Sequence, residues 1–125
     1  MLTSTEAHAL AHRWIAAWND HDLDRILAHY ARDIVFSSPF VQEMGASPSG
    51  TIIGISALHA YFAAALLRYP TLTFRLRAVF VGIDSLTLVY ESVNGLLAAE
   101  TLVLNSQHHV SRVLAQYALE DRSSV

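Results

Sequence analysis

The spacing of apolar residues along this chain changes once, at Pro70, and the change limits the possible folds. Before Pro70, apolar residues recur at the spacing of amphipathic helices. After Pro70 they alternate in stretches rich in Thr, Val, Phe and Leu, which is typical of strands. The pattern predicts an α+β domain in which the helices come first and an antiparallel sheet follows.

The first of three expected helices has the strongest signal. Thr3 and Glu6 have the spacing of a capping box, in which each side chain accepts a hydrogen bond from the backbone of the other residue. An apolar stripe follows and ends in the bulky rings of Trp14 and Trp18. We therefore expect a helix whose rings face the interior of the domain.

Two shorter helices are expected before Pro70. Asp22 can cap one that runs to Tyr30, and Ser56 can cap another that Pro70 ends. Between them, a strand is expected over 34–36 and a surface loop over 42–50, where Gly, Ser and Pro gather without a period.

Four strands are expected in the second half, near 72–81, 86–94, 97–104 and 110–118. The connection at Asn94-Gly95 has the strongest turn signal, because both residues tolerate the positive φ of a tight hairpin. The strands should therefore form an antiparallel meander covered on one face by the helices.

Composition limits the function classes. With 53% hydrophobic residues and a mean hydropathy of +0.33, the 125 residues suffice for one domain with a sizeable core. The net charge is −3 and no basic stripe occurs, so we expect no nucleic-acid partner. The chain has no Cys, its first residues lack the pattern of a signal peptide, and its apolar runs are too short for a bilayer. A soluble cytoplasmic protein without a membrane partner is expected.

The seven His residues do not indicate a metal site. His8 and His12 have the spacing of helical metal ligands, but they lie beside the apolar stripe and no Glu is adjacent to them. No phosphate-binding loop or dinucleotide fingerprint occurs either. We therefore expect neither a metal nor another cofactor.

Glu100 is the main candidate for chemistry. It lies in the run LLAAETLVL at 96–104, and no other Asp, Glu, Lys or Arg occurs between Glu91 and Arg112. In a strand, apolar residues flank it on both faces. A carboxylate removed from water has a raised pKa, and such groups concentrate at functional sites. A Glu paired at an oligomer interface, or one reaching solvent past small Ala residues, is the competing interpretation.

The first half contains, in order, RWIAAWN at 13–19, HDLD at 21–24, YARD at 30–33 and FSSP at 36–39, then Gly50, Ile53-Gly54, Ala57-Leu58 and Tyr61-Phe62. This series resembles the SnoaL-like group of the nuclear transport factor 2 superfamily, which also contains ketosteroid isomerase. The resemblance implies one domain over 1–125. It also implies a cone-shaped, curved antiparallel sheet that encloses one deep apolar pocket with three N-terminal helices.

The resemblance also assigns roles residue by residue. In the ketosteroid isomerase pattern, a Tyr on the first helix donates to the substrate oxygen, and Trp14 takes its place here. The Asp general base of that pattern falls on Ser38, and the protonated Asp of its oxyanion hole falls on Glu100. The resemblance thus supports Glu100 as a pocket acid, while the general base is missing.

Strand parity predicts the wall of the pocket once Glu100 faces inward. Most of the wall is apolar, and simple core packing remains the alternative for each aromatic residue. The predicted substrate-binding residues are Trp14, Trp18, Ser38, Phe40, Phe62, Tyr90, Leu102, Val113 and Tyr117, with Tyr61 and Ser92 beside them.

The opposite face of the sheet mixes apolar and charged side chains, as a subunit interface does. We expect a homodimer through this outer face, although a solvated sheet face would have a similar pattern. The residues concerned are Arg75, Arg77, Val89, Glu91, Val93, Val103, Arg112 and Leu114.

Two functions remain open. One is an enzyme of the isomerase, cyclase or hydratase kind, acting on a small lipophilic metabolite with Glu100 as acid or base. The other is a module that binds such a metabolite without transforming it. An epoxide hydrolase would need an Asp and an Arg in the pocket, but the Arg residues at 68, 75, 77 and 112 are expected to face outward.

Isomerisation of a β,γ-unsaturated ketosteroid should not exceed the buffer rate, even if the steroid fits the pocket. The reason is that Ser38 without an adjacent base cannot remove a proton from carbon, and an indole cannot act as an acid. Absorbance of the conjugated product measures the rate. Turnover well above background that a Ser38 substitution abolishes would contradict this assignment.

Overall fold

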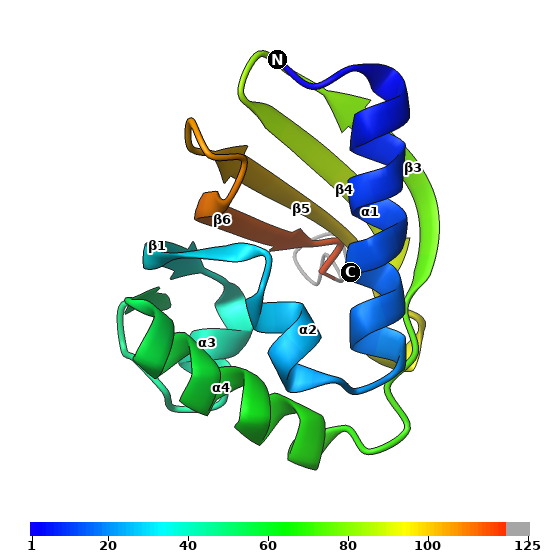
Figure 1. Cartoon of the computed structure of the whole chain (residues 1–125). Coiled ribbons are helices and arrows are strands. Elements are labelled where there is room, and N and C mark those ends of the chain that lie inside the picture. Colours follow the sequence, from blue (N-terminus) through cyan, green and yellow to red (C-terminus); the bar gives the residue numbers. More distant parts are fainter. Residues whose placement is uncertain (120–125) are drawn as a thin grey trace.

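The helices and strands follow the predicted order, and the structure adds three short elements, α3, β2 and η1. It is a computed structural model that describes residues 1–119 (Figure 1). The elements are α1 (Ser4–Asn19), α2 (Leu23–Leu27), β1 (Tyr30–Ser37), α3 (Pro39–Glu43), β2 (Thr51–Ile53), α4 (Ile55–Arg68), β3 (Arg75–Val81), β4 (Ser85–Glu91), the 3₁₀ turn η1 (Val93–Gly95), β5 (Leu97–Leu104) and β6 (Val110–Tyr117).

One six-stranded sheet has the order β2-β1-β6-β5-β4-β3. The last four strands form the predicted antiparallel meander. The expectation of a wholly antiparallel sheet is wrong at one place, because β1 pairs with β6 in parallel. That pair begins with Tyr30 opposite Val110, so Tyr30 belongs to a strand and not to the second helix. Pairing across eighty residues leaves no local signal, which explains the error.

Local capping chemistry determines where the first helices begin. Thr3 and Glu6 form the predicted capping box, and the Asp22 side chain accepts from the Arg25 backbone N–H at the start of α2. The Asn94-Gly95 turn is also confirmed: both residues have positive φ, and the Leu96 N–H donates to the Val93 carbonyl. These signals act within a few residues and are therefore readable from the sequence.

The loop expected over 42–50 is present at 44–50, and an additional short element lies on each side of it. Ser38 caps the additional helix α3 by accepting from the Phe40 N–H at 3.2 Å, and β2 pairs with β1. The structure thus has four helices over residues 1–119 instead of three. Gly54, with a φ of 92°, occupies the N-cap of α4, so the predicted cap at Ser56 is wrong.

The helices cover the inner face of the curved sheet (Figure 1). In that view α1 crosses in front of β3 and β4, while α4 lies alongside β1 and β2. Asn19 ties the end of α1 to the segment before β3, because its side chain donates to the Phe74 carbonyl at 2.9 Å and accepts from the Phe74 N–H at 2.6 Å. Nε2 of His21 lies 2.8 Å from the Leu72 carbonyl oxygen, a second contact between the end of α1 and the segment before β3.

The sheet has the two faces that strand parity predicts. Alternate residues of β4, β5 and β6 are buried under the helices, and Glu100 lies on this inner face. The outer face carries Thr87, Val89, Thr101 and Val103, with Arg75 and Arg77 both close to Glu91 at one end. Val93 was predicted for the outer face but lies at the pocket instead.

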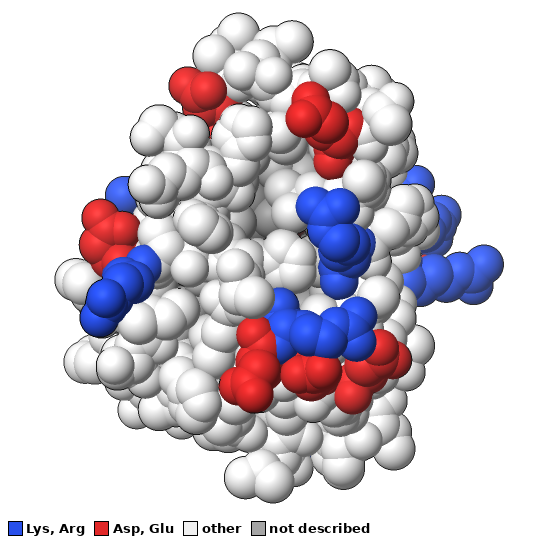
Figure 2. Space-filling model, in the orientation of Figure 1, with Lys and Arg blue, Asp and Glu red and all other residues white. Residues whose placement is uncertain are grey.

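Apart from the buried Glu100, the charged side chains of residues 1–119 are exposed or half-buried. On the face shown in Figure 2, Arg side chains lie next to Asp and Glu side chains. One ion pair joins Arg25 Nη1 to Asp20 Oδ2 at 2.6 Å. None of the helices in residues 1–119 combines the length and apolar character needed to cross a membrane.

Candidate active site

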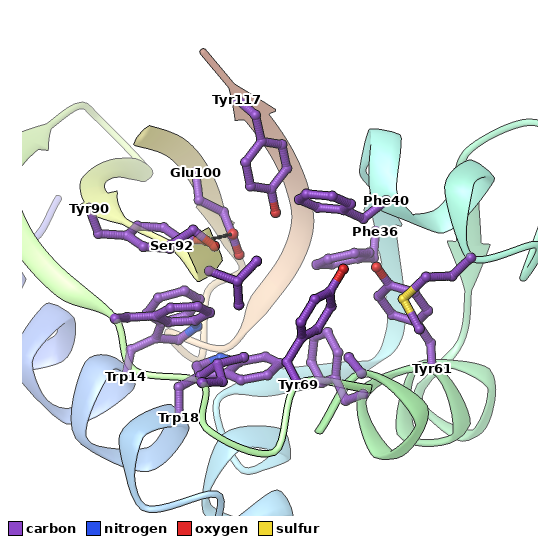
Figure 3. A pocket seen from close by; sticks show the side chains of 16 residues that line it. Trp14, Trp18, Phe36, Phe40, Tyr61, Tyr69, Tyr90, Ser92, Glu100 and Tyr117 are labelled. Atoms are coloured by element: carbon purple, nitrogen blue, oxygen red, sulfur yellow. Dashed lines mark hydrogen bonds between the residues drawn. The ribbon is translucent and has the colours of Figure 1, made fainter. Parts of the chain in front are cut away.

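A pocket opens between the inner face of the sheet and the helices α1 and α4 (Figure 3). Its cavity volume is about 60 Å³, and the space reaches about 520 Å³ only when the open solvent at the mouth is counted. In Figure 3, Trp14 and Trp18 lie on the side opposite Phe36, Phe40 and Tyr61. Seven of the predicted site residues line it: Trp14, Trp18, Phe40, Phe62, Tyr90, Glu100 and Tyr117.

Glu100 projects from the middle of β5 toward this pocket (Figure 3). Its cross-strand neighbours are Leu88 on β4 and Ala115 on β6, which offer no polar group, and only 4% of Glu100 is exposed. The Tyr90 hydroxyl donates a hydrogen bond to Glu100 Oε1 at 2.7 Å. The Tyr90 phenol is therefore the one hydrogen-bond partner of this carboxyl group within residues 1–119.

Burial raises the pKa of Glu100 to about 7, and the hydrogen bond from Tyr90 opposes that rise. Desolvation wins because a single neutral donor replaces only part of the hydration that a carboxylate has in water. Near neutral pH, both the acid and the carboxylate are consequently populated. A group in this state can give or accept a proton without a large energetic cost.

Four tyrosines line the same pocket: Tyr61, Tyr69, Tyr90 and Tyr117. Burial raises the pKa of Tyr61, Tyr90 and Tyr117, and the nearby Glu100 carboxylate adds to the rise. They therefore stay protonated and act as neutral hydrogen-bond donors. In Figure 3 the Tyr117 hydroxyl points into the pocket beside Glu100.

The two indoles differ in their hydrogen bonds. Trp14 Nε1–H donates to the buried Tyr30 hydroxyl at 3.0 Å, so the donor that the resemblance aligned with the catalytic phenol is already used inside the protein. Trp18 Nε1–H is buried, and no acceptor bonds it among residues 1–119.

Aromatic packing holds the pocket wall in shape. Phe74 stacks on Trp14 at a centroid distance of 5.8 Å and contacts Tyr90 at 4.7 Å. Phe40 meets Tyr117 at 4.5 Å on the other side. Because the Asn19 side chain is hydrogen-bonded to the backbone of Phe74, the end of α1 fixes the position of Phe74 in this wall.

Three predicted site residues do not line this pocket. Leu102 and Val113 are paired across β5 and β6 and fully buried in the core. Ser38 caps α3 and borders a separate hollow next to Pro39 and Gln42. Parity placed Leu102 and Val113 on the correct face, but it cannot tell where along a strand the packed core ends and the pocket begins.

Sequence reasoning missed several lining residues: Phe36, Met44, Ala65, Tyr69, Leu72, Phe74 and Val93. Some lie outside the regular elements, where no periodicity applies. The helical stripe that contains Ala65 and Tyr69 was a usable signal, but it cannot distinguish a core side chain from a pocket side chain.

The polar groups in the described residues 1–119 form no metal-binding constellation, since no group of three His, Cys, Asp or Glu side chains lies close enough to share an ion. The Arg side chains at 68, 75, 77 and 112 are exposed, as predicted.

The model of the SnoaL-like domain matches residues 11–118. The chain belongs to the SnoaL-like family. It is similar to a SnoaL-like protein of unknown function from Burkholderia thailandensis, with 38% identity and a TM-score of 0.90 over 94% of this chain and 98% of that one. A search of curated proteins gave no match.

More distant structures share the fold. A proposed ketosteroid isomerase from Kribbella flavida has 18% identity and a TM-score of 0.72, covering 93% of this chain and 80% of that one. A proposed polyketide cyclase from Sinorhizobium meliloti has 12% identity and a TM-score of 0.73, covering 92% of this chain and 100% of that one. The SnoaL-like chain therefore has the nuclear transport factor 2-like fold that its sequence resembles.

Glu100→Gln should remove a fall in stability with rising pH. The folded state keeps the Glu100 proton up to a pKa of about 7, whereas the unfolded chain releases it near about 4.3. Between these values the folded state binds more protons, so the free energy of unfolding decreases as pH rises, by on the order of 3 kcal/mol.

Urea denaturation from about pH 4 to about pH 8 would measure this effect as the difference between the wild type and Glu100→Gln. Glu43→Gln, which changes an exposed carboxyl on α3, serves as the control and should keep the fall. Parallel pH curves for wild type and Glu100→Gln would mean that Glu100 is not desolvated in the folded protein.

Proposed function

We propose that this SnoaL-like protein is an enzyme that moves a proton on a small lipophilic carbonyl compound, as an isomerase, cyclase or hydratase does. The observation that carries the proposal is Glu100, a carboxyl group with a pKa of about 7 at an aromatic pocket. A buried carboxyl with one neutral partner destabilises the fold when it ionises, and such a cost is typical of functional sites.

Glu100 would act through its two protonation states. As a carboxylate it accepts a proton from the carbon next to the carbonyl group, and as the acid it returns a proton to oxygen or to another carbon. The Tyr90 hydroxyl, 2.7 Å from Oε1, fixes the direction of the carboxyl group. Tyr117 is a neutral donor for the oxygen on which negative charge develops.

The pocket walls limit the substrate class. Glu100 is the one residue with a formal charge among the lining residues, which otherwise are aromatic, aliphatic or hydroxyl-bearing. A highly charged substrate would lose its hydration without gaining ion pairs. The structural neighbours named as a proposed ketosteroid isomerase and a proposed polyketide cyclase support a steroid-like or polyketide-like substrate.

The protein should accelerate exchange of the protons next to the carbonyl group of 1-tetralone in deuterated buffer. The rate should rise with pH through about 7 as Glu100 ionises. Glu100→Gln should lower the catalysed rate by roughly 10²-fold or more, the usual contribution of a general base. Mass spectrometry of the recovered ketone measures the exchange.

Asp33→Asn changes an exposed carboxyl on β1 and is the matched control, with an unchanged rate expected. Exchange that stays at the buffer rate while the ketone binds would contradict the enzymatic proposal.

A non-catalytic binding module is the second candidate. It is favoured by the absence of a second Asp, Glu, His, Lys or Arg among the lining residues, since many proton transfers need a paired acid and base. In that case Glu100→Gln leaves an apolar ligand bound, with a loss of at most about 1 to 3 kcal/mol for one missing hydrogen bond.

We also propose that two copies of the chain form a two-fold dimer through the outer face of the sheet. Phe80, Leu97 and Leu114 expose 62%, 42% and 37% of their surface on or beside this face. The neighbouring ion pairs of Arg75 and Arg77 with Glu91 would form a polar rim around the apolar centre.

Leu114→Lys should convert the dimer to a monomer, because a two-fold axis brings the same patch of both copies together and an unpaired charge there is costly. Sedimentation at micromolar concentration measures the mass. Leu67→Lys is the control, since Leu67 is 83% exposed on α4 and outside the sheet. A wild-type protein that sediments as a monomer would contradict the proposal.

A further inference from the structure

The Trp18 indole contains a buried donor that the protein itself does not use. Its side chain lines the pocket, and Trp18 is 6% exposed. No hydrogen-bond acceptor for Nε1–H exists among residues 1–119. It is the one buried side-chain polar atom in that part of the chain left without a partner.

Leaving such a group unpaired is costly. An orphaned buried donor loses its bond to water without compensation, which destabilises a protein by roughly 1 to 3 kcal/mol. Native structures contain few such groups, and an indole nitrogen can only donate. Phe at position 18 would fill much of the same space without this cost, so the packing of α1 alone does not account for an indole.

The ring is also held firmly. Trp18 contacts Phe62 of α4 at a centroid distance of 4.8 Å, Phe74 at 5.4 Å and Trp14 at 6.1 Å. The residue that follows it, Asn19, binds the backbone of Phe74 through two hydrogen bonds. The direction of the Trp18 N–H is therefore set before a ligand arrives, which reduces the entropy lost on binding.

The neighbouring indole provides an internal comparison. Trp14 lines the same pocket one helical turn away, but its Nε1–H is bonded to the Tyr30 hydroxyl. Of the two indole donors at the pocket, Trp18 alone lacks a hydrogen-bond partner among residues 1–119.

We propose that Trp18 Nε1–H is the specificity-determining donor of this site and binds a carbonyl or ether oxygen of the ligand. The inference rests on the proposed use of the pocket and adds a requirement for the ligand. The ligand must present an uncharged oxygen acceptor to α1, on a flat skeleton that the rings of Phe62 and Phe74 can contact. A pure hydrocarbon can make the apolar contacts with the pocket walls, but it leaves Trp18 Nε1–H without a hydrogen-bond acceptor.

The test compares 1-tetralone with tetralin, which has the same fused rings and lacks the carbonyl oxygen. Titrations of ¹⁵N-labelled protein are followed through the two indole N–H resonances, which Trp14→Phe and Trp18→Phe assign. They are run about 1.5 units above the Glu100 pKa of about 7, so that the carboxylate cannot donate to the ketone.

We expect the Trp18 resonance to move downfield with 1-tetralone and not with tetralin. The Trp14 resonance should not move downfield with either probe. Because both probes carry one benzene ring, ring-current effects are matched. The ketone should bind roughly two- to tenfold more tightly than the hydrocarbon, and Trp18→Phe should abolish that preference without weakening tetralin binding. The retained Trp14 resonance reports that the variant is folded.

If both probes bind but move the Trp18 resonance alike, or if the preference for the ketone persists in Trp18→Phe, the inference about Trp18 is wrong and the pocket remains a binding site. The N–H then points at the ring of Phe62, or a tyrosine hydroxyl holds the ketone. If neither probe binds up to its solubility limit, both the inference and the proposed use of the pocket are overturned.

Discussion

The parallel pairing of β1 with β6 is the contact on which the rest of the structure depends. The meander of β3 to β6 could form by local hairpins, but alone it would leave its inner face open to water. Pairing β1 with the last strand joins the helical half of the chain to this sheet. It places α4 alongside β1 and closes the side of the pocket opposite α1.

A second link acts at the other side of the pocket. Asn19 holds the backbone of Phe74, and Phe74 packs against both Trp14 and Tyr90. The hydrogen bond from Tyr90 then holds Glu100. The orientation of the carboxyl group thus depends on a series of contacts from the end of α1 to the middle of β5, most of them between aromatic rings. Such rings resist small displacements because the interior is closely packed.

The electrostatic character of the site follows from what surrounds Glu100 in three dimensions. Leu88, Ala115 and the aromatic walls supply no positive charge, and the one bonded partner is a neutral phenol. A nearby Arg would have lowered the carboxyl pKa and produced a permanent carboxylate. The arrangement gives Glu100 a pKa of about 7, so that the acid and the carboxylate are both present at neutral pH. Proton transfer in both directions is easiest under this condition.

The sequence by itself determined the features that depend on neighbours along the chain. The capping box at Thr3, the cap at Asp22, the Asn94-Gly95 turn and the alternation that faces Glu100 inward are all interactions within a few residues. Tertiary structure decided the parallel β1–β6 pair, the cap of α4 at Gly54 and the division of the inner face into packed core at Leu102 and open pocket at Glu100. It also decided which indole is satisfied, because Tyr30 reaches Trp14 and not Trp18 only after the strands have paired. These outcomes depend on distances between residues far apart in the sequence, which no local pattern encodes.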